Sequence, residues 1–139
     1  MSEEIARYRY GTVLRHVDPG LLELRWHPAT EAMSDDDWST GLLILAAEAE
    51  AARPTALLID ATDFRHSFAD RAGMMRWRDQ HVIPRYNNSG VQRFAFLMPP
   101  AYSGPTAEQG SEPAIDGETA DFPTQWFHGR ETALSWLAG

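Results

Sequence analysis

The residues with the clearest potential for chemistry lie in one short stretch, TALLIDATDFRHSFADRAG, residues 55–73. It places Asp60, Asp63 and His66 close together in the chain, and these residue types can bind a metal ion or transfer protons. Their spacing matches no known set of metal ligands, and a loop gives them no common face. We therefore expect Asp60 to close the preceding strand and Asp63 to form a turn, with no metal and no catalytic residue.

Ser67, in the same stretch, has two interpretations. A phosphate on a serine at the start of a helix would gain from the helix dipole and from the free N–H groups. Ser67 also stands three residues before Asp70 and directly before the apolar Phe68, which is typical of an N-terminal helix cap. The cap accounts for this residue fully, so we predict that Ser67 begins a helix from Phe68 to Val82.

The elements that must position this stretch follow from the hydrophobic pattern. Two strands, YRYGTVLRHV and LLELRWH, are predicted on either side of the turn sequence DPG, with Glu23 on a solvent-exposed face of the second. Ser34 is predicted to cap a long helix that begins SDDDW, because acidic residues suit the first turn. The almost wholly apolar TALLID predicts a central strand that is covered on both faces.

The C-terminal half continues the alternation of strands and helices. QRFAFLM predicts a strand, residues 99–121 a long mobile segment, TQWFH a last strand and RETALSWLA a last helix. Pro84 should end or kink the second helix. Because strands that alternate with helices favour parallel pairing, we predict one α/β domain over residues 1–139. Its sheet would be mixed, mostly parallel and five-stranded, and opened by a β-hairpin.

Composition narrows the classes of function. The 139 residues carry a formal net charge of −8, which argues against binding to nucleic acid or to an anionic membrane. There is no cysteine, so disulfides and a catalytic thiol are excluded. The N-terminus lacks the apolar core of a signal peptide, and the longest apolar run, GLLILAA, is too short to span a bilayer. We expect a cytoplasmic protein that uses no cofactor.

The opening hairpin, the strand ALLIDATDF with its loop, QRFAFLM and the closing WFHGRETALSWL together resemble the STAS domain. This family is named for sulphate transporters and anti-sigma-factor antagonists, and the chain looks closer to the wider SpoIIAA-like group of small bacterial proteins. The resemblance covers nearly the whole chain and implies a regulatory or protein-interaction module, not an enzyme. It also implies that Ser67 or its neighbours occupy the region in which these antagonists carry a phosphorylatable serine at the start of a helix.

The predicted working surface is the loop after the third predicted strand, together with the second helix. The partner would be a protein or a small anionic or apolar ligand, and the pattern is also compatible with a homodimer. The candidate partner- or ligand-binding residues are Asp63, Phe64, Arg65, His66, Ser67, Arg71, Met74, Trp77 and Arg78.

Two other functions stay open. A small-molecule-binding protein would use an apolar pocket at the sheet edge, walled by Phe64, Trp77 and residues 99–121. A hydrolase or isomerase would use His66 with Asp63. An interaction module should show a flat or convex surface, a ligand binder an apolar cavity, and an enzyme a carboxylate-bound His66 inside a cleft.

Charge is unevenly distributed along the chain. Residues 61–93 carry six arginines against three aspartates, whereas residues 99–121, the acidic segment, carry five acidic residues and no basic one. In a parallel sheet the loops after TALLID and QRFAFLM leave from the same edge, where α/β sheets bind ligands. We therefore hypothesise that the acidic segment covers the loop over residues 60–67 and the start of the second helix. Two solvated faces would explain the same pattern.

Overall fold

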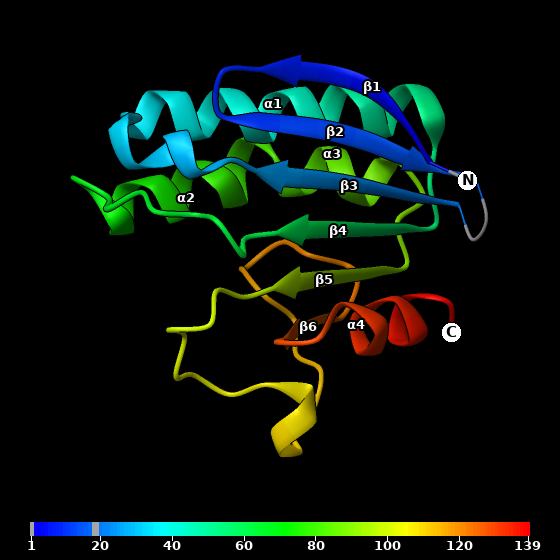
Figure 1. Cartoon of the computed structure of the whole chain (residues 1–139). Helices are drawn as coiled ribbons and strands as arrows, with labels where there is room; N and C mark the ends of the chain where they lie inside the picture. The colour runs from blue at the N-terminus through cyan, green and yellow to red at the C-terminus, as the bar shows by residue number, and fades with distance from the viewer. Residues whose placement is uncertain (1, 18–19) are drawn as a thin grey trace.

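The computed structural model describes residues 2–17 and 20–139, which form a mixed sheet with helices on both faces (Figure 1). In the sheet the described strands follow their order in the chain. The first three pair antiparallel and the last four pair parallel. The α/β class and the mixed sheet are as predicted, but the sheet has six strands instead of five. The strands are β1 (Ser2–Tyr8), β2 (Gly11–His16), β3 (Leu21–Trp26), β4 (Ala56–Asp60), β5 (Arg93–Leu97) and β6 (Thr124–Phe127).

The additional strand comes from the N-terminus. YRYGTVLRHV, predicted as one strand, turns after Tyr8, so that Tyr8 pairs with Gly11. β1 escaped prediction because it is an edge strand whose residues are all exposed or half-buried, and it shows no regular apolar alternation. The predicted DPG turn includes Asp18 and Pro19, which lie outside the described residues.

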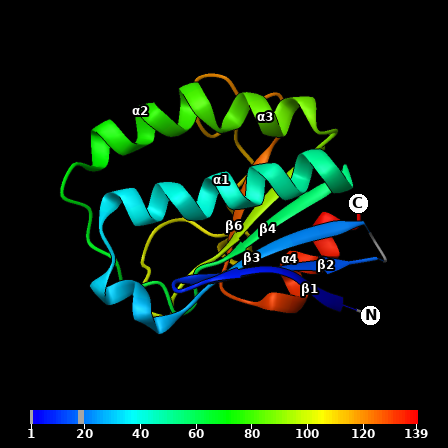
Figure 2. The same cartoon turned by 90° about the horizontal axis from the view of Figure 1, so that it is seen from above.

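Three helices, α1 (Asp35–Ala52), α2 (Arg71–His81) and α3 (Ile83–Asn88), lie over one face of the sheet, here called the helix face (Figure 2). The fourth, α4 (Arg130–Leu137), lies over the opposite face, here called the α4 face. Short 3-10 turns occupy residues 28–32 and 107–109. The two helical crossovers, from β3 to β4 and from β4 to β5, therefore both lie on the helix face, whereas α4 follows the last strand.

The start of α1 confirms the predicted cap. The hydroxyl of Ser34 accepts a hydrogen bond from the N–H of Asp37 at 3.1 Å, and the carboxylate of Asp37 accepts one from the N–H of Ser34 at 2.9 Å. This reciprocal pair satisfies two N–H groups that have no partner inside the helix.

The second predicted helix starts later than its sequence indicated. Asp70, not Ser67, caps α2, and its carboxylate accepts a hydrogen bond from the N–H of Gly73 at 2.9 Å. Ser67 is exposed in the preceding loop. Pro84 interrupts the helix as predicted, because α2 ends at His81 and the short α3 follows directly.

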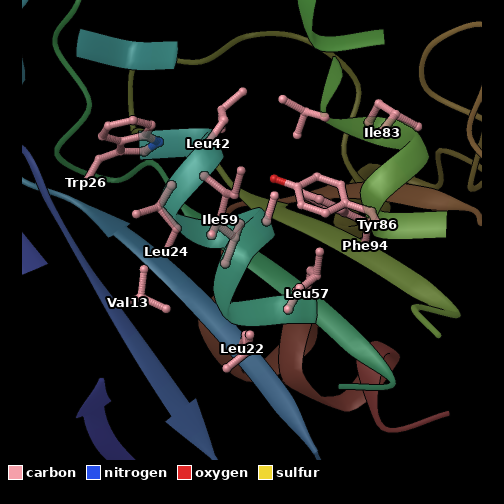
Figure 3. Close-up of a cluster of buried hydrophobic side chains, with 14 of the residues drawn as sticks. Val13, Leu22, Leu24, Trp26, Leu42, Leu57, Ile59, Ile83, Tyr86 and Phe94 are labelled. Carbon is pink, nitrogen blue, oxygen red and sulfur yellow. The ribbon is translucent and has the colours of Figure 1, made fainter. Parts of the chain in front are cut away.

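The two central strands bury apolar side chains on both faces. On the helix face, Leu24, Leu57 and Ile59 belong to the larger hydrophobic cluster (Figure 3). On the α4 face, Leu58 belongs to a second cluster that includes Leu137 of α4. The burial of all five residues of β4 confirms the predicted central strand.

Glu23 departs from the predicted pattern. Its position on β3 was expected to face solvent, yet its side chain is fully buried on the α4 face. Three side chains, those of His16, Arg25 and Arg130, reach its carboxylate and cover it. The alternation of residues along β3 does not predict the burial of Glu23, because Arg130 comes from the far end of the chain.

Candidate ligand-binding cavity

An apolar cavity of about 600 Å³ lies between the helix face of the sheet and the helices above it. Residues of β3 to β6 line one wall, and residues of α1 to α3 line the opposite wall. The acidic segment borders the cavity through Pro99, Tyr102 and Asp116. The volume lies within the range of about 300–1,000 Å³ that is typical of pockets for small molecules.

The cavity exists because α2 does not pack closely on the sheet. No residue of α2 is buried, whereas α1 buries Trp38 and Leu42, among others. The side chains of α2 that line the cavity are Arg71, Met75 and Arg78, whose spacing puts them on one face of the helix. A guanidinium group is costly to bury without partners, so arginines at both ends of this stripe disfavour close packing on the sheet.

Paired aromatic rings make the wall of the cavity near the carboxyl end of β4. Trp26 and Phe64 meet edge to face with ring centroids 5.4 Å apart. Trp38 and Phe68 meet in the same way at 5.1 Å. Aromatic side chains in such pairs have few conformations to lose, so this wall is largely formed before any ligand arrives.

Four of the nine predicted binding residues line the cavity: Phe64, His66, Arg71 and Arg78. Arg71 is exposed, and its guanidinium carbon lies 5.6 Å from the centroid of the Phe68 ring. Arg78 is more enclosed, with 13% of its side chain exposed. The sequence therefore identified one side of the cavity, at the loop and along α2.

The other five predicted residues lie elsewhere. Met74 and Trp77 face α1, where the sulfur of Met74 accepts a weak hydrogen bond from Ser39 and the Trp77 ring packs beside Trp38. The remaining three, Asp63, Arg65 and Ser67, are exposed in the loop. Trp77, which was expected to wall a pocket together with Phe64, packs beside Trp38 and does not line the cavity.

His66 has a different carboxylate partner from the one predicted. Its Nε2 lies 2.8 Å from Oδ1 of Asp35 at the start of α1, and not beside Asp63. The same carboxylate accepts hydrogen bonds from the N–H groups of Ala69 and Asp70, at 3.1 and 2.9 Å. The hydrogen bond from the N–H of Asp70 is the main cause of a lowered pKa of Asp35. Burial raises this pKa, but the hydrogen bonds from Ala69 and His66 lower it further. Asp35 therefore ties the loop to α1.

Asp60 closes β4 as predicted, because its Oδ1 accepts a hydrogen bond from the N–H of Thr62 at 3.0 Å. The loop is also held from the other side by Thr30. The buried hydroxyl of Thr30 accepts a hydrogen bond from the N–H of Arg65 at 2.9 Å and donates to the carbonyl of His27 at 2.8 Å. Fixed at both sides, the loop presents Phe64 and His66 to the cavity.

The acidic segment contacts the end of α2 instead of its start. Nη1 of Arg78 donates to Asp116 at 3.1 Å, while its Nε and Nη2 donate to the neighbouring Asp79. The hydroxyl of Thr119 donates to the carbonyl of Asp79 at 2.8 Å, and the carbonyl of Thr119 accepts from the side chain of Asn87 at 2.7 Å. These contacts lie about two helical turns beyond the predicted position.

Sequence reasoning missed Tyr86, which lines the cavity from α3 and is 1% exposed. Its hydroxyl has no hydrogen-bond partner among the described residues. In Figure 3 this hydroxyl points away from α3, toward Leu42 and Ile59. No local pattern marks Tyr86 in the sequence, because the residues that line the cavity with it come from separate strands and helices.

Within residues 2–17 and 20–139, no group of three His, Cys, Asp or Glu side chains is placed to hold a metal ion. No helix in that part of the chain is long and apolar enough to cross a membrane. Comparisons with protein-family models, with curated proteins and with solved structures find no match to this chain.

Proposed function

We propose that this protein binds a small, largely apolar molecule in the cavity between the sheet and α1 to α3. The observation that carries the proposal is the cavity itself, whose walls are mostly aromatic and aliphatic and whose polar groups are few. This combination is typical of small-molecule sites, in which apolar area supplies affinity and a few polar groups orient the ligand.

The paired rings at Trp26 and Trp38 favour the same function. They hold the wall in shape through contacts with Phe64 and Phe68, which lie in the loop that Asp35 ties to α1. A wall that is already ordered lowers the entropic cost of binding. A cavity of this kind supports the small-molecule alternative better than the interaction module, for which a flat or convex surface was expected.

Filling the cavity tests the proposal. Met75→Trp places a large ring on the stripe of α2 that lines the cavity, whereas Arg76→Trp places the same ring on the exposed neighbour. With the neutral dye Nile red as probe, we expect saturable binding to the wild type and about a tenfold loss of affinity, about 1.4 kcal/mol, in Met75→Trp. Arg76→Trp should bind like the wild type. Equal affinities in all three proteins would contradict the proposal.

The regulatory or protein-interaction module implied by the resemblance to STAS domains stays a prediction. Its working surface would include Arg65 and Arg71, which are exposed beside the cavity. Co-purification of partners at low salt, repeated with Arg65→Ala, would test it, because a contact residue should be needed for retention of the partner.

The hydrolase or isomerase also stays a prediction, with Asp35 in place of Asp63 as the partner of His66. His66 lines the cavity and is bound to a carboxylate, which is part of the geometry expected of an enzyme. Yet Asp35 also accepts two backbone N–H groups of the loop, and this anchoring accounts for the pair without chemistry. The binding function is therefore the better supported.

A further inference from the structure

The buried hydroxyl of Tyr86 is the least satisfied polar group of the cavity. Burial raises the pKa of Tyr86, and the charges of Arg78 and Arg85 offset this only in part, so the phenol stays neutral and can donate a hydrogen bond. Leaving a buried donor without a partner is energetically costly. A ligand with a hydrogen-bond acceptor at this depth would recover that cost.

Arg78 supplies a second donor to the same cavity. Its guanidinium uses three of its five N–H groups on Asp79 and Asp116, which leaves two without a partner among the described residues. Tyr86 and Arg78 line one cavity, and the charge of Arg78 acts on Tyr86. Both side chains have hydrogen-bond donors without a partner, and the cavity walls beside them are apolar. They are suited to a ligand that joins a hydrogen-bond acceptor to an apolar group.

We infer that the natural ligand is an apolar carboxylic acid whose carboxylate accepts hydrogen bonds from Tyr86 and Arg78. This inference rests on the proposed binding function and names the class of ligand for the same cavity. A carboxylate suits the site better than a phosphate, because Asp79 and Asp116 already surround Arg78 and would repel a dianion more strongly. A planar carboxylate also matches the fork of the guanidinium group.

Asp116 is the group with which such a ligand competes. It occupies Nη1 of Arg78 at 3.1 Å and belongs to the acidic segment that borders the cavity. The charge of Asp116 repels a ligand carboxylate that accepts from the two remaining N–H groups of Arg78. Removing the charge of Asp116 should therefore strengthen the binding of acids and leave the binding of neutral molecules unchanged.

The test uses two probes that share one aromatic body, 2-naphthylacetic acid and the hydrocarbon 2-ethylnaphthalene, each measured by displacement of Nile red from the full chain. We expect the acid to bind the wild type about tenfold more tightly, since hydrogen bonds to charged groups are among the strong ones. Tyr86→Phe should remove most of this preference without weakening the hydrocarbon. Asp116→Asn should increase the affinity of the acid alone.

Tyr102→Phe is the matched control, because Tyr102 also lines the cavity but its hydroxyl already donates to the carbonyl of Pro105 at 3.2 Å. It should leave the preference for the acid intact. If the hydrocarbon binds the wild type as tightly as the acid, or if Tyr86→Phe weakens both probes equally, the inference fails and cavity binding survives. If the dye binds but neither probe displaces it, the inference alone fails; if the dye itself does not bind, both proposals fail.

The thermal stability of the free protein gives an independent readout. Tyr86→Phe removes an unsatisfied buried hydroxyl and keeps the ring, so the melting temperature should stay equal or rise. A fall of several degrees would mean that the hydroxyl serves the fold of the free protein, and it would overturn the role assigned to Tyr86.

Discussion

The two faces of the sheet differ in whether a buried polar group has hydrogen-bond partners. On the α4 face the carboxylate of Glu23 is fully buried and meets His16, Arg25 and Arg130 at 2.9, 3.1 and 3.0 Å. On the helix face Tyr86 is equally enclosed, yet its hydroxyl meets no partner among the described residues. The charged group is thus fully paired, and the neutral one is not.

The difference in hydrogen bonding distinguishes a structural role for Glu23 from a ligand-binding role for Tyr86, which the sequence alone cannot do. Buried polar groups in folded proteins are normally hydrogen-bonded, so the saturated Glu23 is explained by the architecture of the α4 face. Arg130 at the start of α4 reaches across to Glu23 on β3 and so ties the last helix to the sheet. Tyr86 is not explained in this way, and it lies at a cavity. Missing partners, more than charge, therefore mark the candidate site.

The largest expected effect compares two neighbours on β4. Leu58 packs in the cluster of the α4 face, whereas Ile59 points to the helix face and lines the cavity. Leu58→Ala should cost about 4 kcal/mol of unfolding free energy, and Ile59→Ala about 2 kcal/mol, because a side chain beside a cavity has fewer atoms to lose contact with. Denaturant unfolding of both variants measures this, and equal losses would contradict the comparison.

A smaller effect is expected from the charge network of the α4 face. Arg130→Met leaves Glu23 buried with only Arg25 and His16, and we expect a loss of about 2–3 kcal/mol. This is less than the cost of leaving a buried charge with no partner at all.

The matched control for that variant is Arg85→Met, which breaks the ion pair of Arg85 with Glu50, where both side chains are at least one-third exposed. Water and salt screen surface pairs of this kind, so the loss should be much smaller than that of Arg130→Met. Denaturant unfolding measures the free energy of unfolding of both variants. Similar losses would show that an ion pair with the buried Glu23 stabilises the protein no more than a surface pair does.

The sequence predicted the parts of the fold that depend on local pattern. β4 was predicted because its residues are almost all apolar, and the cap at Ser34 because the capping residues adjoin the helix. β1 was missed because an edge strand needs no apolar face. The start of α2 was misplaced because Asp70 caps it, and a carboxylate from α1, that of Asp35, satisfies the N–H groups just before it.

The candidate site was predictable only along one helix and one loop. Phe64 and His66 follow a central strand at the edge where ligands bind, and Arg71 and Arg78 stand on one helical face. The distance of α2 from the sheet depends on how separate elements pack, and so does the isolation of Tyr86. Neither of these two features produces a periodic pattern in the sequence. Two arginines seven residues apart with Met75 between them do indicate a helical face that is not fully buried.

The smallest expected effect is a difference in pH dependence between the two faces. Burial alone raises the pKa of Glu23, but the hydrogen bonds from Arg130 and His16 and the charges of Arg130 and Arg25 outweigh it and lower the pKa below its ordinary value of about 4.3. A lowered pKa in the folded state stabilises the protein above about pH 4.3, and this contribution disappears as the pH falls through the folded-state pKa.

Glu23→Gln should therefore be less stable than the wild type at pH 7, and the difference should narrow as the pH falls below about 4. Tyr86→Phe should show a constant difference from the wild type over the same range, because the raised pKa of Tyr86 keeps its phenol protonated throughout. Unfolding free energies measured between pH 7 and pH 3 decide this. If the difference in unfolding free energy between Glu23→Gln and the wild type stays constant with pH, the ionised carboxylate adds nothing to stability. The two faces would then show the same pH dependence.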